Sequence, residues 1–310
     1  MNVVYLGSGD IGLPTLEWLL ASPEVRVVGV VTQPDRPAGR GLQVKPCAVK
    51  ELAIRHGLVP LQPAKVRGME AVAQLAALEA DLFVVMAYGQ ILPQEVLDLP
   101  RLGAINLHAS LLPRHRGAAP VHAAVLAGDR ISGITVMWMD AGLDTGDILL
   151  REECELQPDE TAGSLHNRLA QLAPEALARA IRLIAGGHAP RVRQEESEAS
   201  YAPKLDRTQG RLCWGASAAD LDRRIRGLYP WPGCTAVAEL ENGKSVDLKV
   251  HRAAVREGAA PAGDLAGGLR IGCGGGGLLE LCEVQPAGGK KMSGEDFLRG
   301  YRPRRMLDAV

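Results

Sequence analysis

Residues 3–20 have the sequence VVYLGSGDIGLPTLEWLL, and this stretch decides the fold class. A short run of β-branched and other apolar residues comes first, followed by three glycines within six positions. Leucines and a tryptophan then recur at the spacing of one helix face. A strand, a tight glycine turn and a helix in this order form the start of an α/β unit.

The same alternation continues over the first half of the chain. Apolar, strand-like segments recur at residues 25–32, 81–87, 103–108 and 133–139. Helical patterns lie between most of them, at residues 48–56, 68–78 and 120–126. Strands that are apolar throughout are typical of a sheet that is covered on both faces. These segments therefore predict a Rossmann-like, doubly wound α/β domain with a mostly parallel sheet.

The pattern changes in the second half of the chain. A predicted helix over residues 162–185 is followed by a polar, charged stretch at 186–202, which is typical of a linker. After a further helix at 218–226, short alternating segments at 235–240, 246–251 and 278–284 lie between Gly-rich turns. This pattern predicts a small, OB-like β-barrel. We expect a catalytic domain over residues 1–189, a linker over 190–207 and a C-terminal barrel over 208–310.

The composition excludes several classes of protein. Hydrophobic residues make up 46% of the 310 positions, and 35 basic against 36 acidic side chains leave a net charge of −1. This balance excludes a disordered or uniformly polycationic chain. No apolar run reaches the roughly 18–20 residues that span a bilayer, and the chain opens without a secretory leader. We therefore expect a cytoplasmic protein without membrane contact and, since no oligomerisation repeat stands out, a monomer.

The positions of the cysteines and of the charged residues limit the kinds of site that the chain can contain. The six cysteines are scattered and form no C-x-x-C pair, which indicates neither a disulfide framework nor a zinc site. From residue 206 onward, 16 Lys and Arg residues accompany 13 Asp and Glu residues, so the second domain is net basic. Lys290, Lys291 and the cluster at residues 302–305 concentrate this charge. The charge alone is compatible with a surface for a polyanion or with a solvated tail.

The glycine turn, GSGDIG at residues 7–12, matches the G-x-G-x-x-G pattern of dinucleotide-binding proteins. Such a site also requires an acidic residue about 20 positions further on, at the end of the second strand, to hold the ribose. Here that strand ends in VVTQ, and Asp10 would place a carboxylate beside a bound pyrophosphate. We therefore expect no NAD and interpret the turn as a site of close backbone packing.

Polar residues that could take part in catalysis lie at the end of the strand at 103–108. Asn106 and His108 alternate with Leu107, so both side chains point to one side at the carboxyl edge of the sheet, where open α/β folds bind ligands. Histidine exchanges protons near neutral pH, and an Asn amide donates to an oxyanion. No Ser or Cys lies beside them in a nucleophile turn. The pair therefore predicts acyl-type transfer in which the substrate supplies the nucleophile.

A second polar cluster, MDAGLDTGD at residues 139–147, follows the next strand. Its three carboxylates raise the hypothesis of a metal site, but His and Glu partners are missing nearby, so we expect no metal. We favour orientation of His108 by Asp144. A carboxylate beside an imidazole selects its tautomer and favours its protonated form, which a proton-transfer step requires.

Four motifs together resemble the 10-formyltetrahydrofolate-dependent formyltransferases: NLH at 106–108, SLLPR at 110–114, RGAAP at 116–120 and LDTGD at 143–147. The family's catalytic Asn, His and Asp correspond to Asn106, His108 and Asp144. The resemblance implies attack of an amine on the formyl carbon of the folate. It assigns stabilisation of the oxyanion to Asn106 and protonated His108, and assigns support of His108 and proton relay to the leaving folate nitrogen to Asp144.

The resemblance also implies a folate pocket and a tRNA-binding surface. The implied folate contacts are Tyr88, Gln90, Ile91, Leu92, Ser110, Leu111, Leu112, Pro113 and Asp140, with a cis bond between Leu112 and Pro113. The loop TQPDRPAGRG at 32–41 is similar to that of family members that formylate initiator methionyl-tRNA, and YAPK at 201–204 extends the similarity toward the second domain. The implied tRNA contacts are Arg36, Arg40, Lys45, Lys204, Lys290 and Lys291, with Arg40 as the key cation.

Three positions depart from the family motif: His115 replaces the usual Trp, Ala109 the usual Gly and His122 the usual Gln. We expect function to survive, with changes at the rim of the pocket. The alternatives are a formyltransferase for an amino-sugar nucleotide or glycinamide ribonucleotide, a non-catalytic RNA-binding protein, and an NAD-dependent oxidoreductase. The cationic loop, the intact trio and the missing acidic residue argue against these three in turn.

Overall fold

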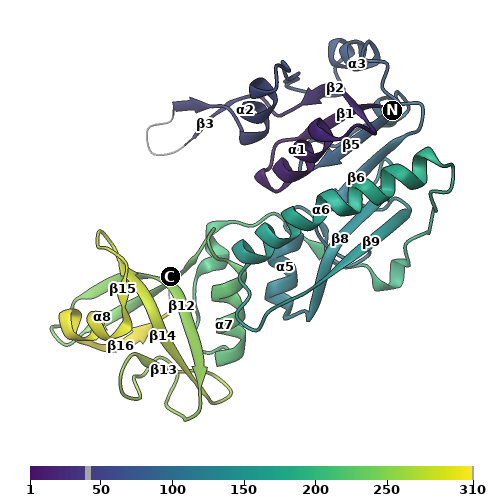
Figure 1. Ribbon diagram of the computed structural model, residues 1–310. Coiled ribbons are helices and arrows are strands. Elements are labelled where there is room, and N and C mark those ends of the chain that lie inside the picture. Colours follow the sequence, from purple (N-terminus) through teal and green to yellow (C-terminus); the bar gives the residue numbers. More distant parts are fainter. Residues whose placement is uncertain (39–42, 309–310) are drawn as a thin grey trace. The chain divides into compact units, whose positions relative to one another are not determined.

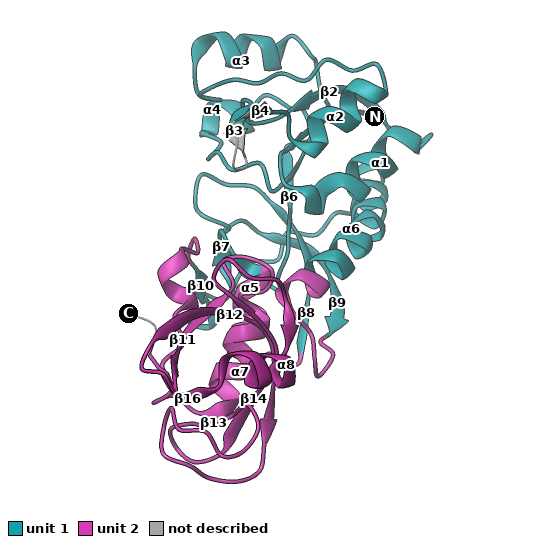
Figure 2. Cartoon of the chain, turned by 90° about the vertical axis from the view of Figure 1, so that its left-hand side faces the viewer, with its two compact units in different colours: residues 1–120, 131–155, 166–202 teal, residues 121–130, 156–165, 203–310 magenta. Residues whose placement is uncertain are grey.

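The computed structural model describes residues 1–38 and 43–308, and Figure 1 colours the chain by sequence. The chain divides into two compact units, which Figure 2 distinguishes by colour. Unit 1 comprises residues 1–120, 131–155 and 166–202, and unit 2 comprises residues 121–130, 156–165 and 203–310. The last change between units falls at 202–203, inside the predicted linker, so the bounds of that linker stay a prediction.

A six-stranded sheet forms the centre of unit 1 (Figure 1). Its order is β2 (Arg26–Val31), β1 (Asn2–Gly7), β5 (Leu82–Met86), β6 (Ala104–His108), β8 (Ile131–Trp138) and β9 (Ile148–Glu155). The first four strands are parallel, whereas β8 and β9 run antiparallel to their neighbours. The predicted α/β fold is confirmed. The sequence pattern misses β9, because exposed charged residues alternate with half-buried ones in the second half of this strand.

Helices cover both faces of this sheet. The α1 helix (Leu13–Ala21) and most of α6 (Ala162–Ala185) lie on one face, and α3 (Met69–Ala76) and α4 (Gln94–Leu97) lie on the other (Figures 1 and 2). Side chains of β1 divide in the same way. Val4 and Leu6 pack in one core cluster with residues of α3 and α4, whereas the Tyr5 hydroxyl donates to the Gly12 carbonyl just before α1. Burial on both faces explains why the first strand is apolar throughout.

The glycine turn between β1 and α1 packs against Tyr5 and the end of β5. A methyl group at Gly7 would lie 2.6 Å from the Tyr5 ring, and one at Gly12 would overlap the Tyr5 hydroxyl oxygen. The Ser8 amide and the next amide both donate to the Ala87 carbonyl, at 3.1 Å. The glycines therefore permit close packing, and two amides that a pyrophosphate would need already have partners.

The loop after β2 contains a two-stranded antiparallel ribbon. Its strands are β3 (Arg36–Ala38) and β4 (Gln43–Lys45), and Arg36 lies opposite Lys45. Arg40, the key cation implied by the family resemblance, lies outside the described residues.

Unit 2 contains a strongly curved antiparallel sheet. Its order is β13 (Arg270–Gly272), β14 (Leu278–Pro286), β12 (Ser245–Arg256), β11 (Cys234–Leu240) and β16 (Pro303–Leu307). Residues 264 and 265 form bridges to Arg305 on β16 and to Ile271 on β13, so one segment links the two edge strands and nearly closes the sheet. The predicted small β-barrel is confirmed.

The remaining α-helices and strands are short. They are α2 (Ala48–Arg55), α5 (Pro120–Ala127), α7 (Ala218–Gly227), α8 (Gly294–Tyr301), β7 (Arg116–Gly117), β10 (Tyr201–Ala202) and β15 (Met292–Ser293). The sequence pattern predicts α7 and misses α8, an eight-residue helix that Ser293 caps by accepting from the Asp296 amide.

Candidate active site

Strand β6 carries two of the side chains that the sequence singles out, and both reach the carboxylate of Asp144. The Asn106 amide donates to Asp144 Oδ1 at 3.5 Å, and His108 Nδ1 lies 3.6 Å from Asp144 Oδ2. The side chains of His108 and Asp144 are only 6% and 14% exposed, so bulk water and salt screen their interaction weakly. The structure thus brings together the three residues that we expect to be catalytic.

Both ring nitrogens of His108 face oxygen atoms. Nε2 lies 2.9 Å from the carbonyl oxygen of His115, and because a carbonyl can only accept, the proton on this side belongs to Nε2. Nδ1 faces the carboxylate of Asp144. A second proton on Nδ1 would therefore meet a negatively charged acceptor. The ring is held in one orientation and is placed to take or release a proton at Nδ1.

Asp144 reaches β6 by a route that the sequence pattern does not reveal. Because β8 is antiparallel to β6, the loop at 139–147 begins at the end of β6 opposite to His108. It folds back, and Asp144 Oδ2 accepts from the Gly117 amide at 2.8 Å. Asp144 has a φ of 53°, in the left-handed region, which Asp enters at a smaller cost than most non-glycine residues but less readily than the common backbone regions. Other contacts must therefore hold this residue in place.

Residues from the polar stretch at 186–202 supply those contacts. The Gln194 amide nitrogen donates to the carbonyl oxygens of Asp144 and Gly146, both at 2.8 Å. The Gln194 amide oxygen accepts from Arg116 Nε at 3.1 Å, and the Arg116 side chain is 1% exposed. Sequence reasoning misses both residues. The available signal was the charged Arg116 inside an otherwise small and apolar motif, RGAAP.

The turn after β6 is held against β8 and β9. The Leu112–Pro113 bond is cis, as the family resemblance implies. The Leu112 amide donates to the Thr135 hydroxyl at 3.1 Å, and this hydroxyl donates to the Ser110 carbonyl at 2.6 Å. Arg151 on β9 donates to the Leu112 carbonyl at 2.5 Å. The polypeptide beside His108 is therefore fixed by side chains from the two antiparallel strands.

His115, which replaces the family's usual Trp, is 7% exposed and lies in the interior rather than at an exposed rim. Its amide donates to the Ser200 hydroxyl at 2.9 Å, and its backbone has a φ of 60°. The His115 carbonyl oxygen is the group that accepts from His108 Nε2. The backbone conformation at His115 therefore helps to orient the His108 ring.

Apart from Asp140, which follows β8, the residues expected to bind folate follow β5 and β6, whose carboxyl ends are neighbours in the sheet. Tyr88 is 2% exposed, burial raises its pKa to about 12, and its hydroxyl has no hydrogen-bond partner in the described part of the chain. Gln90 holds the backbone instead, accepting from the Val66 amide at 2.8 Å and donating to the Pro63 carbonyl at 3.0 Å.

The other expected folate residues differ widely in exposure. Leu111 is half-buried and Ile91 is exposed. The other four are buried: Leu92, Ser110, Leu112 and Pro113. Asp140 is exposed, and its carboxylate accepts from the Thr145 hydroxyl at 2.8 Å and from the Gly142 amide at 3.0 Å. This carboxylate therefore stabilises its own loop.

The expected tRNA contacts within the described residues all lie at the surface: Arg36, Lys45, Lys204, Lys290 and Lys291. Lys291 forms an ion pair with Glu283 at 3.0 Å and lies 5.7 Å from the centre of the Tyr229 ring. Solvent-accessible cations therefore lie in both units, as the binding of a polyanion requires.

A polar network holds the base of the ribbon. The Lys50 ammonium on α2 donates to the Asp35 carboxylate and to the Gln62 side-chain oxygen, both at 2.6 Å. The Gln62 amide donates to the same carboxylate at 2.9 Å, and hydrogen bonds from Gln62 and Lys50 lower the pKa of Asp35. Gln33 donates to the Tyr88 carbonyl at 3.2 Å. The ribbon and the predicted folate segment are therefore joined through side chains.

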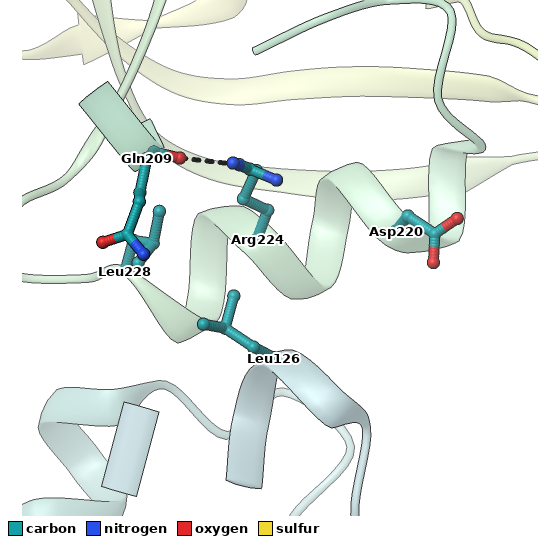
Figure 3. A pocket seen from close by; sticks show the side chains of 5 residues that line it. All are labelled: Leu126, Gln209, Asp220, Arg224 and Leu228. Carbon is teal, nitrogen blue, oxygen red and sulfur yellow. Dashed lines mark hydrogen bonds between the residues drawn. The ribbon is translucent and has the colours of Figure 1, made fainter. Parts of the chain in front are cut away.

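Unit 2 contains a cavity of about 400 Å³, lined by Leu126, Gln209, Asp220, Arg224 and Leu228 (Figure 3). Arg224 Nε donates to the Gln209 carbonyl at 2.7 Å. These lining residues are separate from the folate residues expected in unit 1. Among residues 1–38 and 43–308, His, Cys, Asp and Glu side chains form no group of three that could hold a metal ion. None of the described helices is both long and apolar enough to cross a membrane.

The site combines an amide donor, an oriented imidazole and a carboxylate on a Rossmann-like unit. This combination defines an α/β enzyme equipped for acid–base group transfer. The family model described as formyl transferase matches residues 1–181, and that described as formyl transferase, C-terminal domain, matches residues 204–302. The chain belongs to the formyl transferase family.

Its relatives share the whole length of the chain. A methionyl-tRNA formyltransferase from Ectopseudomonas mendocina is 47% identical over 306 residues, covering 97% of this chain and 95% of the relative. One from Pseudomonas fluorescens is 46% identical over 314 residues, covering 100% and 97%. Among solved structures, the N-formyltransferase from Helicobacter canadensis has a TM-score of 0.65 at 15% identity, covering 94% of this chain and 99% of that one. This last similarity concerns the fold.

Proposed function

We propose that this protein transfers the formyl group of 10-formyltetrahydrofolate to the α-amine of methionine on initiator tRNA, for the initiation of translation. The observation that carries the proposal is the geometry around Asp144, whose carboxylate lies between the Asn106 amide and the His108 ring. Full-length relatives named methionyl-tRNA formyltransferase support the choice of acceptor. The folate is a co-substrate, and neither a metal nor NAD takes part.

The reaction forms one C–N bond and breaks another. The amine nitrogen attacks the formyl carbon, the carbonyl oxygen becomes negatively charged, and the bond to the folate nitrogen then breaks. One Asn106 amide proton faces Asp144, which leaves the other to donate to the oxyanion. His108 Nδ1 and Asp144 hold the proton that must move from the attacking amine to the departing nitrogen.

The folate is proposed to lie along the residues that follow β5 and β6. Gln90 supports this placement, because its hydrogen bonds to the Val66 amide and the Pro63 carbonyl fix the backbone that follows β5. The turn at Ser110–Pro113 is fixed by Thr135 and Arg151, so it is preformed for a ligand.

The tRNA is proposed to contact the segment at residues 35–45 through Arg36, Arg40 and Lys45, and unit 2 through Lys204, Lys290 and Lys291. Cationic phosphate partners of this kind make affinity fall steeply with salt. The division into a catalytic domain (1–189), a linker (190–207) and a tRNA-binding domain (208–310), a monomeric state and a cytoplasmic location belong to the same proposal.

The test is transfer of labelled formyl from 10-formyltetrahydrofolate to charged initiator tRNA. We expect His108→Ala to reduce kcat by about 10²–10³-fold, since a preorganised donor contributes that much. His56→Ala, which changes an exposed histidine of the same unit, is the matched control and should retain activity. Arg40→Ala should mainly raise the KM for tRNA.

Other outcomes separate the alternatives. Transfer only to small amines, to an amino-sugar nucleotide or to glycinamide ribonucleotide would preserve the catalytic assignment and refute the tRNA acceptor. A wild-type protein that leaves the folate unchanged would refute the proposed reaction.

A further inference from the structure

Gln194 is the residue whose placement the proposed reaction leaves unexplained. It comes from a stretch with the composition of a linker, yet its side chain is 7% exposed and both its amide nitrogen and its amide oxygen bond to groups of the site. A segment that only connects two units has no reason to bury a long polar side chain, because burial costs conformational entropy and desolvation. Its contacts therefore indicate a specific role.

The bonds of Gln194 define which way its amide faces. The Arg116 guanidinium can only donate, so it takes the amide oxygen. The carbonyls of Asp144 and Gly146 can only accept, so they take the two protons of the amide nitrogen. A flipped amide would oppose a donor to a donor and an acceptor to two acceptors. Only one orientation satisfies all of these groups.

Arg116 anchors this arrangement from the other side. Its Nη1 donates to the Glu196 carboxylate at 2.9 Å, which balances a guanidinium that is 1% exposed. The next residue, Gly117, donates to the Asp144 carboxylate. The pair of residues in β7 thus holds Asp144 twice, through its side chain directly and through its backbone by way of Gln194.

We propose that Gln194 and Arg116 are positioning residues that hold Asp144 in its left-handed conformation and so fix its carboxylate against His108. The inference rests on the proposed function and deepens it, because the formyl acceptor and donor both react where Asp144 and His108 meet. Without the two amide donors, a residue at a φ of 53° relaxes toward the common backbone regions and its carboxylate moves away from Nδ1.

Two substitutions that introduce side chains of nearly the same size as Gln194 distinguish a positioning role from a packing role. Gln194→Glu retains the bond to Arg116 but sets a carboxylate against two carbonyl oxygens, whereas Gln194→Met fills the space and makes none of the bonds. Glu195→Gln changes the charge of the neighbouring residue, whose carboxylate only accepts from Ser197 in the same turn, and serves as the matched control.

We expect both Gln194 variants to lose roughly 10- to 100-fold in kcat, because small misplacements of catalytic groups have effects of this size. Gln194→Glu should lose at least as much as Gln194→Met, while the KM values for folate and tRNA change less than about threefold. Glu195→Gln should behave as the wild type. Should Gln194→Met fail to fold, the Gln194→Glu variant, which retains the bond to Arg116, is compared with the wild type and with Glu195→Gln instead.

A second readout does not depend on the substrate. Imidazole ¹⁵N resonances, with that of His108 assigned from a His108→Asn variant, should shift in Gln194→Glu and stay unchanged in Glu195→Gln. Unchanged His108 resonances together with wild-type kcat in Gln194→Glu would overturn the inference, as would a clearly milder loss than in Gln194→Met. If the wild type formylates no tRNA, the proposed function fails, and the His108 resonances alone decide the positioning role.

Discussion

Replacing Gly12 by Ala tests whether the glycine turn exists for packing. Gly12 has φ −86° and ψ −3°, a negative-φ conformation that L-residues also adopt at the third position of type I turns, so the substitution adds little backbone strain. Its methyl group would overlap the Tyr5 hydroxyl oxygen, while the next Tyr5 atom, the ring carbon that bears the hydroxyl, would lie at 3.4 Å. Nearly all of the clash therefore comes from one oxygen atom.

The magnitude follows from that geometry. Overpacking at a fully buried position costs about 1–3 kcal/mol, and displacing the Tyr5 hydroxyl from the Gly12 carbonyl, which it reaches at 3.1 Å, costs about 1 kcal/mol more. Tyr5→Phe alone should cost about 1 kcal/mol. In the double variant the clash is absent, so the total should be about 1 kcal/mol, well below the sum of the single changes.

The assay is urea unfolding of the four proteins in this cycle, followed by tryptophan fluorescence. Trp18 on α1 lies just after the turn and reports on unit 1. Equal destabilisation by Gly12→Ala in the wild-type protein and in the Tyr5→Phe variant would refute the packing explanation. Loss of formyl transfer without loss of stability would point instead to a ligand at the turn.

Two further predictions concern other polar contacts of unit 1. The Asp10 carboxylate lies 3.2 Å from His166, and their mutual hydrogen bond lowers the pKa of Asp10 and raises that of His166. The pair should stabilise unit 1 by at most about 0.5 kcal/mol. This stabilisation should be greatest between pH 3.8 and pH 6.5, the ordinary pKa values of the two groups, and smaller at higher or lower pH. Unfolding of His166→Gln as a function of pH checks this, and a destabilisation that persists at pH 9 contradicts it. Lys50→Met, which removes the bond to Asp35, should raise the KM for tRNA roughly fivefold with the KM for folate unchanged. Arg101→Met is its control in steady-state kinetics, and equal changes in the two KM values would show a general loss of structure.

Local sequence determined much of the secondary structure. The predicted helix at 162–185 coincides with α6, and the first strands are recognised because burial on both faces demands unbroken apolar sequence. Asn106 and His108 are recognisable for a similar reason, since alternation along one strand places both side chains on one side. Where burial is one-sided, as in β9, the charged residues that face solvent hide the strand.

The sequence by itself therefore determined the α/β unit, the small barrel, the family and the residue types at the site. Tertiary structure alone decided how Asp144 comes to lie beside His108, because the antiparallel direction of β8 and the fold of the 139–147 loop depend on contacts between distant segments. It also decided the role of Gln194, whose bonds span 78 positions to Arg116 and 50 to Asp144. Hydrophobic periodicity records which face of an element is buried, but it carries no information about which distant polar group a side chain will meet.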